Sequence, residues 1–352
     1  MITQLFQFCL TGFQMSWSVK KTLCFLVIFL LFFQTKSQVL SNTRANEGTL
    51  KHLVHLKVYF RAFENEEEVS YDSIMTSGSL IKPNWILTAA HNVEDHEETE
   101  NGITTDYFFH KVKVKAGTKD RKNYDKETTQ KRTIFKEDII IHERRPLFVF
   151  YDVALLYAIK KFDITNTVEP AKLLEPGMEF DADAKCVIQG WGYNELVYNK
   201  DNQLVYPSDQ PKHAMQGFVN ILNGEKCASK YNVNGRRRFN SYLNLCYGCN
   251  NGTCEQTTKG DSGTPIVCAL EKGDNPLING VVVAVHSFGC KDVSEKCFPN
   301  GPSAGVDVRR ISIWIELETM KRGDRTGVNQ SSASMYPYLI AAAVIIVLKY
   351  FY

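Results

Sequence analysis

The chain has 352 residues, of which 44% are hydrophobic and 23% are charged, and its formal net charge at pH 7 is +2. This length and apolar content are enough for one large or two small domains. The sequence has no basic stripe with interleaved aromatic residues, which argues against nucleic acid as a partner, and it has no evident internal repeat.

Residues 1–37 are predicted to be a secretory signal peptide. Lys20 and Lys21 precede an unbroken apolar run at 23–33, and a short polar segment follows it. The apolar run is too short to span a bilayer comfortably. Met15 lies just before this block and is an alternative start of the chain.

Short β-strand signals, separated by glycine, proline, asparagine or charged turns, dominate the middle of the chain. They lie at 53–60, 111–116, 153–158 and 281–286. This spacing is typical of an all-β barrel or sandwich. The lysine-rich stretch 111–132 alternates with acidic and polar residues and is predicted to be a solvated loop. One helical period is evident near the C-terminus, and its shared face consists of Ile311, Trp314, Ile315 and Met320.

Three separate motifs contain a histidine, an aspartate and a serine, in that order. Leu-Thr-Ala-Ala-His ends at His91, Tyr-Asp-Val-Ala-Leu-Leu contains Asp152, and Lys-Gly-Asp-Ser-Gly-Thr-Pro contains Ser262. A serine hydroxyl is a poor nucleophile at neutral pH. It needs an imidazole to accept its proton and a carboxylate to hold that imidazole in the right tautomer. These three residues are therefore the candidate catalytic groups.

The motifs resemble those of the trypsin/chymotrypsin family of serine proteases. Residues 186–192 are similar to the family's Cys-x-x-x-Gly-Trp-Gly strand, Ser287-Phe288-Gly289 to its cleft-lining segment, and 311–320 to its closing helix. The resemblance implies an all-β fold of two six-stranded antiparallel β-barrels, with the active site between them and a C-terminal helix. It assigns residues 45–322 to a trypsin-like peptidase domain.

The resemblance also implies a role for each catalytic group. Ser262 is expected to attack a peptide carbonyl and form an acyl-enzyme, His91 to carry the proton, and Asp152 to orient the imidazole. The oxyanion hole is expected from the backbone N–H groups of Gly260 and Ser262. Ser287 is expected to hydrogen-bond to Asp152.

The substrate pocket is expected to differ from that of trypsin. Gln256, six residues before the nucleophile, falls at the pocket base, where a neutral amide offers no countercharge to Arg or Lys. Ser303, followed by Ala304 and Gly305, falls on the far wall. The other pocket residues that the resemblance implies are Ser287, Phe288 and Gly289. The sequence thus predicts a primary specificity that is not trypsin-like.

Eight cysteines outside the signal peptide, an even number in a secreted chain, predict disulfides. The resemblance implies the pairs Cys186–Cys268 and Cys227–Cys246. The family's bridge beside the catalytic histidine is missing at both ends, because Thr76 and Asn92 stand where its cysteines would be.

The other four cysteines crowd two loops near the pocket. They are Cys249, Cys254, Cys290 and Cys297. Three connectivities are open, and at least one bond is expected to cross between the loops. Zinc is disfavoured because no second Cys-x-x-Cys pair follows and the compartment is oxidising. No metal or other cofactor is expected, since 118–122 offers cations where a calcium loop would need carboxylates.

Activation by cleavage is a further expectation from the resemblance. Arg44 ends a short predicted propeptide, 38–44, and cleavage there by an activating protease would free Ala45 to pair with Asp261. Ala45 would bury less apolar surface than the usual Ile. Thr264 replaces a usual glycine just after the nucleophile turn. Protein or peptide substrates and protease inhibitors are the other expected partners.

The C-terminal end is predicted to associate with a membrane. A polar linker at 323–334 precedes a hydrophobic tail at 335–352, in which 339–348 is unbroken and apolar. A cleaved glycolipid-anchor signal, a short transmembrane helix and a buried or unprocessed tail all remain open. Asn251 and Asn329 begin glycosylation sequons.

The leading hypothesis is a secreted or cell-surface serine endopeptidase. The alternative is a catalytically weak or silent homologue that binds or regulates partners through the same fold. The intact triad favours the enzyme, whereas Ala45 at the expected activation terminus and the unusual pocket favour the binding protein.

Overall fold

The structure of the chain is a computed structural model, which describes residues 51–323 apart from short gaps. The gaps are 101, 147–149, 181–184, 194–196, 199–203, 206–209, 233–237, 249–256, 258, 272 and 290–300. The chain divides into two units, Met1–Ile311 and Ser312–Tyr352. The predicted signal peptide, propeptide and hydrophobic tail lie outside the described residues.

The first half of the described chain forms one antiparallel sheet. Its strands are β1 (Leu53–Glu64), β2 (Glu67–Lys82), β3 (Trp85–Thr88), β4 (His96–Glu100), β5 (Ile103–Ala116), β6 (Gln130–Phe135), β7 (Ile139–Ile141) and β8 (Ala154–Tyr157). The strand order is β4-β5-β1-β2-β3-β8-β7, and β6 pairs with β5. Two short 3-10 helices, η1 (Ala90–Asn92) and η2 (Lys136–Asp138), interrupt the connections.

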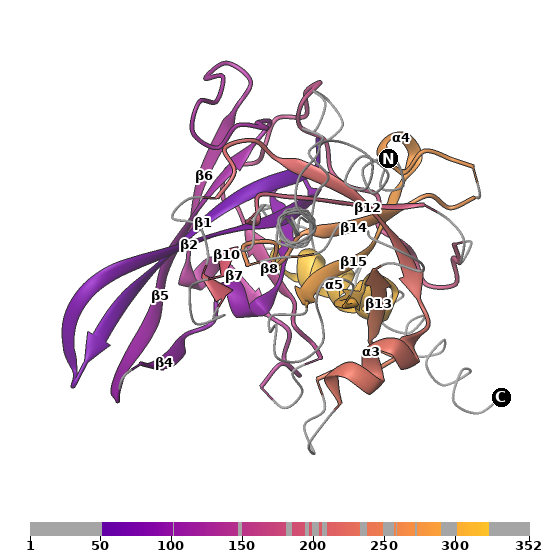
Figure 1. The fold of residues 1–352 in the computed structure, drawn as a ribbon. Coiled ribbons are helices and arrows are strands. Elements are labelled where there is room, and N and C mark those ends of the chain that lie inside the picture. The colour runs from indigo at the N-terminus through magenta and orange to yellow at the C-terminus, as the bar shows by residue number, and fades with distance from the viewer. Residues whose placement is uncertain are drawn as a thin grey trace, which may run out of the picture. The chain divides into compact units, whose positions relative to one another are not determined.

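The core of this sheet follows from alternation along the strands. Val54, Leu56, Val58 and Phe60 on β1 are all buried, and they pack with Val112 and Val114 of β5 and with Ile86 of β3. Alternate residues of a strand point to opposite faces, so one face of β1 is apolar and the other carries lysine and tyrosine. Figure 1 shows β1, β2 and β5 continuing far beyond this core, with β4 beside them.

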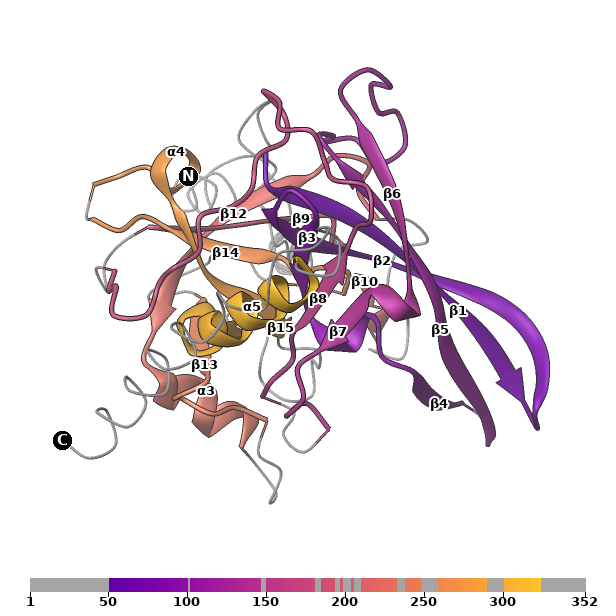
Figure 2. The same cartoon turned by 180° about the vertical axis from the view of Figure 1, so that it is seen from behind.

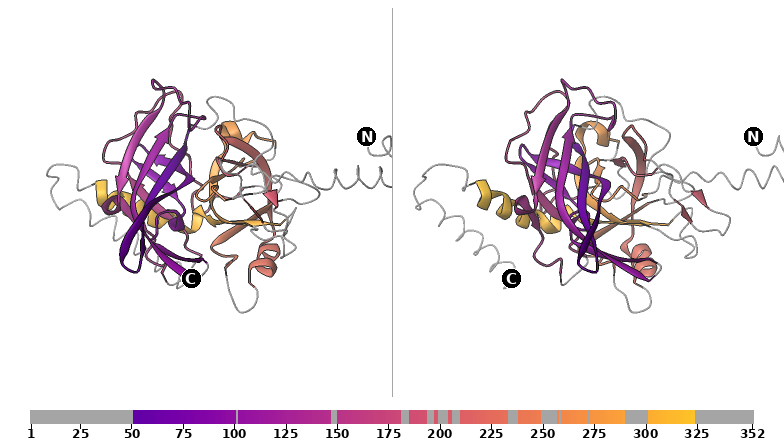
Figure 3. Two further views of the ribbon diagram at one scale, coloured as in Figure 1. Left: turned by 60° about the vertical axis from the view of Figure 1, so that its left-hand side comes forward. Right: turned by 90° about the vertical axis from the view of Figure 1, so that its left-hand side faces the viewer.

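The second half forms a closed barrel. Its strands are β9 (Cys186–Gly190), β12 (Met215–Leu222), β13 (Asn244–Gly248), β14 (Pro265–Cys268), β15 (Val281–Phe288) and β16 (Ser303–Asp307), in the order β12-β13-β16-β15-β14-β9. A separate two-stranded ribbon pairs β10 (Val197–Tyr198) with β11 (Leu204–Val205). The sheet of the first half and the barrel of the second lie side by side in Figure 3.

The prediction of a chymotrypsin-like all-β fold is confirmed, but only one of the two sheets is a closed six-stranded barrel. The first is a half-barrel of eight strands, and no pairing among its described residues closes it. Its last strands diverge, since β6 adds to β5 while β7 adds to β8, with η2 between β6 and β7. The extension of β2 is exposed from Glu67 to Asp72, so it adds to the sheet without adding to the core.

The expected solvated loop at 111–132 is partly wrong. β5 runs to Ala116 and β6 begins at Gln130, so both ends of that stretch are strands. Lysines on their outward face do not interrupt pairing, because only one face of each strand has to be apolar.

Helices are few in the described chain. α3 (Gly224–Tyr231) and α4 (Pro276–Asn279) are short, and α5 (Val308–Gly323) contains the predicted helical period; α3 and α5 are also labelled in the reverse view of Figure 2. Within the described residues, no helix has the length and apolar character needed to cross a bilayer.

Candidate active site

His91 and Asp152 lie close to paired strands of the first sheet. His91 follows β3 inside η1, after the fully buried Ala89 and Ala90. Asp152 lies just before β8, which pairs with β3. Ser262 comes from the second sheet, in the turn that leads into β14. The site therefore joins residues that are far apart in sequence.

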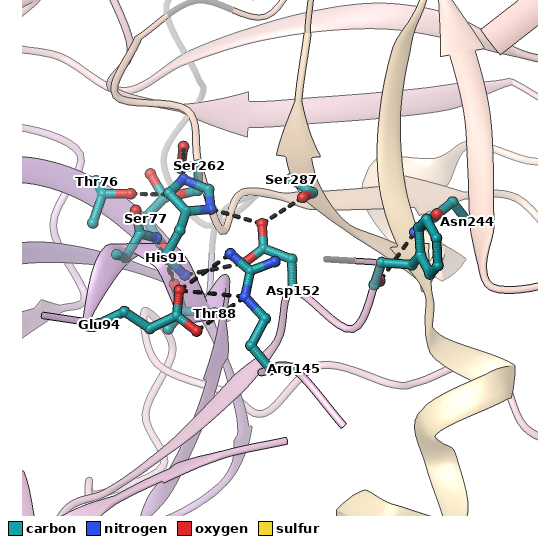
Figure 4. A network of polar contacts seen from close by, with 12 residues as sticks. Thr76, Ser77, Thr88, His91, Glu94, Arg145, Asp152, Asn244, Ser262 and Ser287 are labelled. Atoms are coloured by element: carbon teal, nitrogen blue, oxygen red, sulfur yellow. Dashed lines mark hydrogen bonds and ion pairs between the residues drawn. The ribbon is translucent and has the colours of Figure 1, made fainter. Parts of the chain in front are cut away.

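The three groups form a continuous hydrogen-bonded chain. The Nε2 atom of His91 lies 2.7 Å from the Oγ of Ser262, and its Nδ1 lies 2.6 Å from the Oδ2 of Asp152. The backbone N–H of His91 also donates to Oδ1 of Asp152 at 3.0 Å. Figure 4 shows the imidazole of His91 between the serine and the carboxylate. This double contact fixes both the position and the rotation of the ring.

Asp152 is buried, with 2% of its surface exposed, and is surrounded by donors. The Ser287 hydroxyl donates to its Oδ2, as the resemblance implied. Arg145 places Nη2 3.6 Å from Oδ1. Burial alone would raise the pKa of Asp152, but the facing His91, Arg145 and Ser287 hold it well below its usual range. Asp152 is therefore ionised near neutral pH.

Arg145 was not singled out in the sequence. Its Nε donates to Oε1 of Glu94 at 2.9 Å, and its Nη2 donates to Oε2 at 3.1 Å, so the guanidinium is held in place behind Asp152. Figure 4 shows Glu94 and Arg145 on the same side of the carboxylate. No sequence motif marks this pair, because Glu94 and Arg145 are 51 residues apart in the sequence.

Two residues of β2 hold the backbone of Ser262. The Thr76 hydroxyl and the backbone N–H of Ser77 both donate to the Ser262 carbonyl, the latter at 3.3 Å. Asn92, the other residue at a missing-cysteine position, donates from Nδ2 to the Thr88 hydroxyl at 3.1 Å. Polar contacts thus occupy both positions at which the family has its bridge.

The turn that carries Ser262 depends on glycine. Gly260 has φ +96°, and a Cβ there would lie 1.9 Å from Nε2 of Gln210. Gly263 has φ +78°, and a Cβ there would lie 2.1 Å from the Thr88 hydroxyl. Larger side chains would therefore strain the backbone and collide with their neighbours. Gln210, which no motif indicated, packs directly against Gly260.

Asp261, next to the nucleophile, is fully buried. Its Oδ1 accepts a hydrogen bond from the backbone N–H of Gly192 at 2.9 Å. A Cβ at Gly192 would lie 2.1 Å from the Asp261 carboxylate, so this approach requires glycine. Arg44 and Ala45, the expected activation residues, lie outside the described part of the chain.

Two of the predicted pocket residues, Ser303 and Gly289, lie close to Thr257. The hydroxyls of Thr257 and Ser303 lie 2.7 Å apart, and a Cβ at Gly289 would lie 2.3 Å from the Thr257 Oγ1. Phe288 instead packs edge-on against Tyr231, with ring centroids 4.8 Å apart. Thr257 was missed in the sequence, although its place directly after Gln256 was a usable signal. Gln256 itself lies outside the described residues.

Two disulfides are present, and they join the pairs that the resemblance implied. Cys186 bonds to Cys268 across the neighbouring strands β9 and β14. Cys227 of α3 bonds to Cys246 of β13. The remaining cysteines, Cys249, Cys254, Cys290 and Cys297, and the sequon residues Asn251 and Asn329 lie outside the described residues.

Comparisons with known proteins agree with this fold. The family model described as Trypsin matches residues 57–315. Tryptase of Mus musculus is 31% identical over 242 residues, which cover 68% of this chain and 76% of tryptase. Ovochymase-2 of Mus musculus is 26% identical over 302 residues, 84% of this chain but only 42% of that protein. The solved structure described as GrC shares the fold, with a TM-score of 0.55 at 19% identity, covering 79% of this chain and 97% of that one.

Proposed function

Because the chain belongs to the trypsin family of serine proteases, we propose that it is an endopeptidase that hydrolyses peptide bonds through an acyl-enzyme on Ser262. One observation carries the proposal. The Ser262 hydroxyl, the His91 ring and the Asp152 carboxylate form an unbroken chain with separations of 2.7 and 2.6 Å. These distances lie within the reach that direct proton transfer requires.

The proposed reaction begins when Ser262 Oγ attacks the scissile carbonyl and His91 Nε2 accepts its proton. His91 then returns the proton to the leaving amine, and water repeats the sequence to release the acid. Asp152 keeps the ring in the tautomer whose Nε2 is free to accept. Its depressed pKa supports this role, since the carboxylate stays charged while the imidazolium forms.

The developing oxyanion is proposed to bind the backbone N–H groups of Gly260 and Ser262. The positive φ of Gly260 is consistent with a turn whose amides point outward. Gln210 packs on Gly260 and, through Nε2, donates to the Met75 carbonyl at 3.3 Å. We expect this contact to help position the Gly260 amide before substrate binds.

Primary specificity is proposed to be unlike that of trypsin. The described pocket residues Thr257 and Ser303 contribute hydroxyls that are bonded to each other. Gln256, immediately before Thr257, supplies a neutral amide. A buried Arg or Lys of the substrate would lose its hydration without gaining an ion pair there. Uncharged side chains are therefore the preferred occupants.

We further propose that the enzyme is secreted and activated by cleavage after Arg44, with the new terminus at Ala45 pairing with Asp261. The signal-like block at 1–37 and the complete burial of Asp261 support this proposal. The hydrophobic segment 335–352 supports attachment to the cell surface.

A fluorophosphonate probe tests the proposed activity. The processed protein should be labelled stoichiometrically on Ser262, and Ser262→Ala and His91→Ala should not be labelled. Folding of both variants is checked by circular dichroism. If cleavage after Arg44 is verified by N-terminal sequencing and Ser262 still remains unlabelled, the protein is a silent homologue that uses this fold for binding.

A further inference from the structure

A pocket of about 540 Å³ lies on the outer face of the first sheet, on the side of β1 opposite the core. Strands β1, β5 and β6, the loop between β5 and β6, and Met75 of β2 form its walls. Six cationic side chains line it, and no Asp or Glu is among its described lining residues. The cations are Lys57, Lys113, Lys115, Arg121, Lys131 and Arg132. We call this the cationic pocket.

Strand register places like charges opposite each other in this pocket. Lys57 of β1 is paired with Lys113 of β5, and Lys115 of β5 is paired with Lys131 of β6. Like charges directly opposite each other destabilise a sheet. Burial and the charges of Lys131 and Arg121 lower the pKa of Lys115 despite the favourable contact with Tyr124. An anion between these strands would relieve the repulsion.

Two tyrosine rings hold the lysines in place. The ammonium groups of Lys57 and Lys113 lie 5.1 and 5.2 Å from the ring centre of Tyr59. Those of Lys115 and Lys131 lie 4.2 and 4.1 Å from the ring centre of Tyr124. Such cation-π contacts keep the charges close to the pocket instead of dispersed in solvent.

His55 gives the pocket a buried polar wall. It is only 3% exposed, and neither ring nitrogen has a hydrogen-bond partner. Burial, followed by the charges of Lys115, Arg121 and Lys57, lowers its pKa to about 3, so the ring is neutral near neutral pH. A neutral imidazole still has one N–H to donate. A buried donor without a partner is unfavourable, so an acceptor oxygen from a ligand would satisfy it.

We propose that the cationic pocket binds a tetrahedral oxyanion, the sulfate or phosphate group of an ester. Several lysines on three strands and one imidazole donor match an anion that offers acceptor oxygens in several directions. A single sulfate or phosphate group is much smaller than the pocket volume, which leaves room for the organic part of the ester. This site is separate from the catalytic groups and does not depend on catalysis.

Binding is measured by calorimetry on the full processed chain, with glucose 6-sulfate and glucose 6-phosphate as probes and sodium chloride added to equal ionic strength. Specific binding of either probe supports the pocket, and the tighter of the two assigns the ester. Lys113→Gln and Lys131→Gln should each weaken binding about tenfold, because each removes one charge-assisted contact. Lys226→Gln, an exposed lysine on α3, should leave the Kd unchanged.

A second readout separates lost binding from misfolding. Without any probe and at low salt, Lys113→Gln should melt at the same temperature as the unmodified protein or higher, because it removes a charge facing Lys57. Equal heats with the esters and with chloride alone would overturn the proposal. Unchanged affinity in both lysine variants would do so as well.

Discussion

At the residue scale, the neutral pair of Thr257 and Ser303 leads to a prediction about specificity. Peptide-library profiling of the unmodified enzyme should show no dominant preference for Arg or Lys at the cleaved position. Gln256→Asp should shift the preference toward these residues, because a carboxylate would supply the missing countercharge.

The neutral variant Gln256→Asn is the matched control, since it alters the size of the side chain at Gln256 without adding a charge. It should keep the original profile. A hundredfold preference for basic residues in the unmodified enzyme would instead show that Gln256 is not at the pocket base or that another carboxylate reaches the pocket.

A second residue-scale prediction concerns His55 and acid stability. Its pKa is lowered to about 3 in the folded protein, compared with 6.5 for an unperturbed histidine. Burial disfavours the charged form of the ring, and the charges of Lys115, Arg121 and Lys57 lower the pKa further. The unfolded chain therefore binds a proton that the folded chain does not bind between these two values. The contribution of His55 to the free energy of unfolding is fully present above pH 6.5 and is lost progressively as the pH decreases. By pH 5 this one group should lower the free energy of unfolding by about 2 kcal/mol.

Urea unfolding followed between pH 7 and pH 5 measures this slope. His55→Phe, which retains the edge contact with Trp191, should make this slope shallower. Part of the slope should remain, because desolvation also lowers the pKa of His52, to about 4, and this histidine contributes with the same sign. The exposed His96 on β4 supplies the control, because His96→Asn should leave the slope as it is. An unchanged slope in His55→Phe would contradict the assignment.

The catalytic residues were predictable one by one, whereas their supports were not. His91, Asp152 and Ser262 each lie in a short local motif, so sequence alone was enough to name them. Glu94 reaches Arg145, the ion-pair partner of Asp152, across 51 residues of sequence, and Thr76 reaches Ser262 across 186 residues. Such contacts depend on how sheets pair, which no local pattern encodes.

At the scale of elements, β2 links the long exposed extension of the sheet to the nucleophile. Thr76 near its end is 1% exposed and donates to the Ser262 carbonyl. Thr76→Val keeps the shape of the side chain but removes this hydrogen bond. We expect a loss of about 1 kcal/mol in unfolding free energy. The rate at which Ser262 is labelled by the fluorophosphonate probe should also fall several-fold, because the Ser262 carbonyl loses one of its two hydrogen bonds to β2.

Urea unfolding and the rate of labelling by the fluorophosphonate probe test this effect together. Thr99→Val, at an exposed position on β4, is the control and should change neither quantity. If Thr76→Val is as stable and as reactive as the unmodified protein, the Thr76 hydroxyl has no positioning role.

The strands were predicted in the right places but with the wrong lengths. The signal at 53–60 covers most of the buried part of β1, which continues to Glu64, and β5 begins at Ile103, well before the predicted 111. Most residues of the missing parts are exposed or half-buried, and apolar and polar residues do not alternate regularly along them, so they lack the pattern that marks a strand. Backbone pairing with neighbouring strands maintains them instead.

At the scale of the whole molecule, disulfide bonds are unevenly distributed, because no cysteine lies between residues 25 and 185. Both described disulfides belong to the second half, and they close loops of 82 and 19 residues. Bridges of these lengths stabilise by about 4.5 and about 3 kcal/mol in the chain-entropy model. Reduction with dithiothreitol should therefore lower amide-exchange protection in β9, β13 and β14 before it lowers protection in β1 and β3.

Fluorophosphonate labelling should be lost with the barrel, because Ser262 lies at the start of β14 while His91 belongs to the first sheet. Equal, simultaneous loss of protection in both sheets would show instead that they unfold as one cooperative unit.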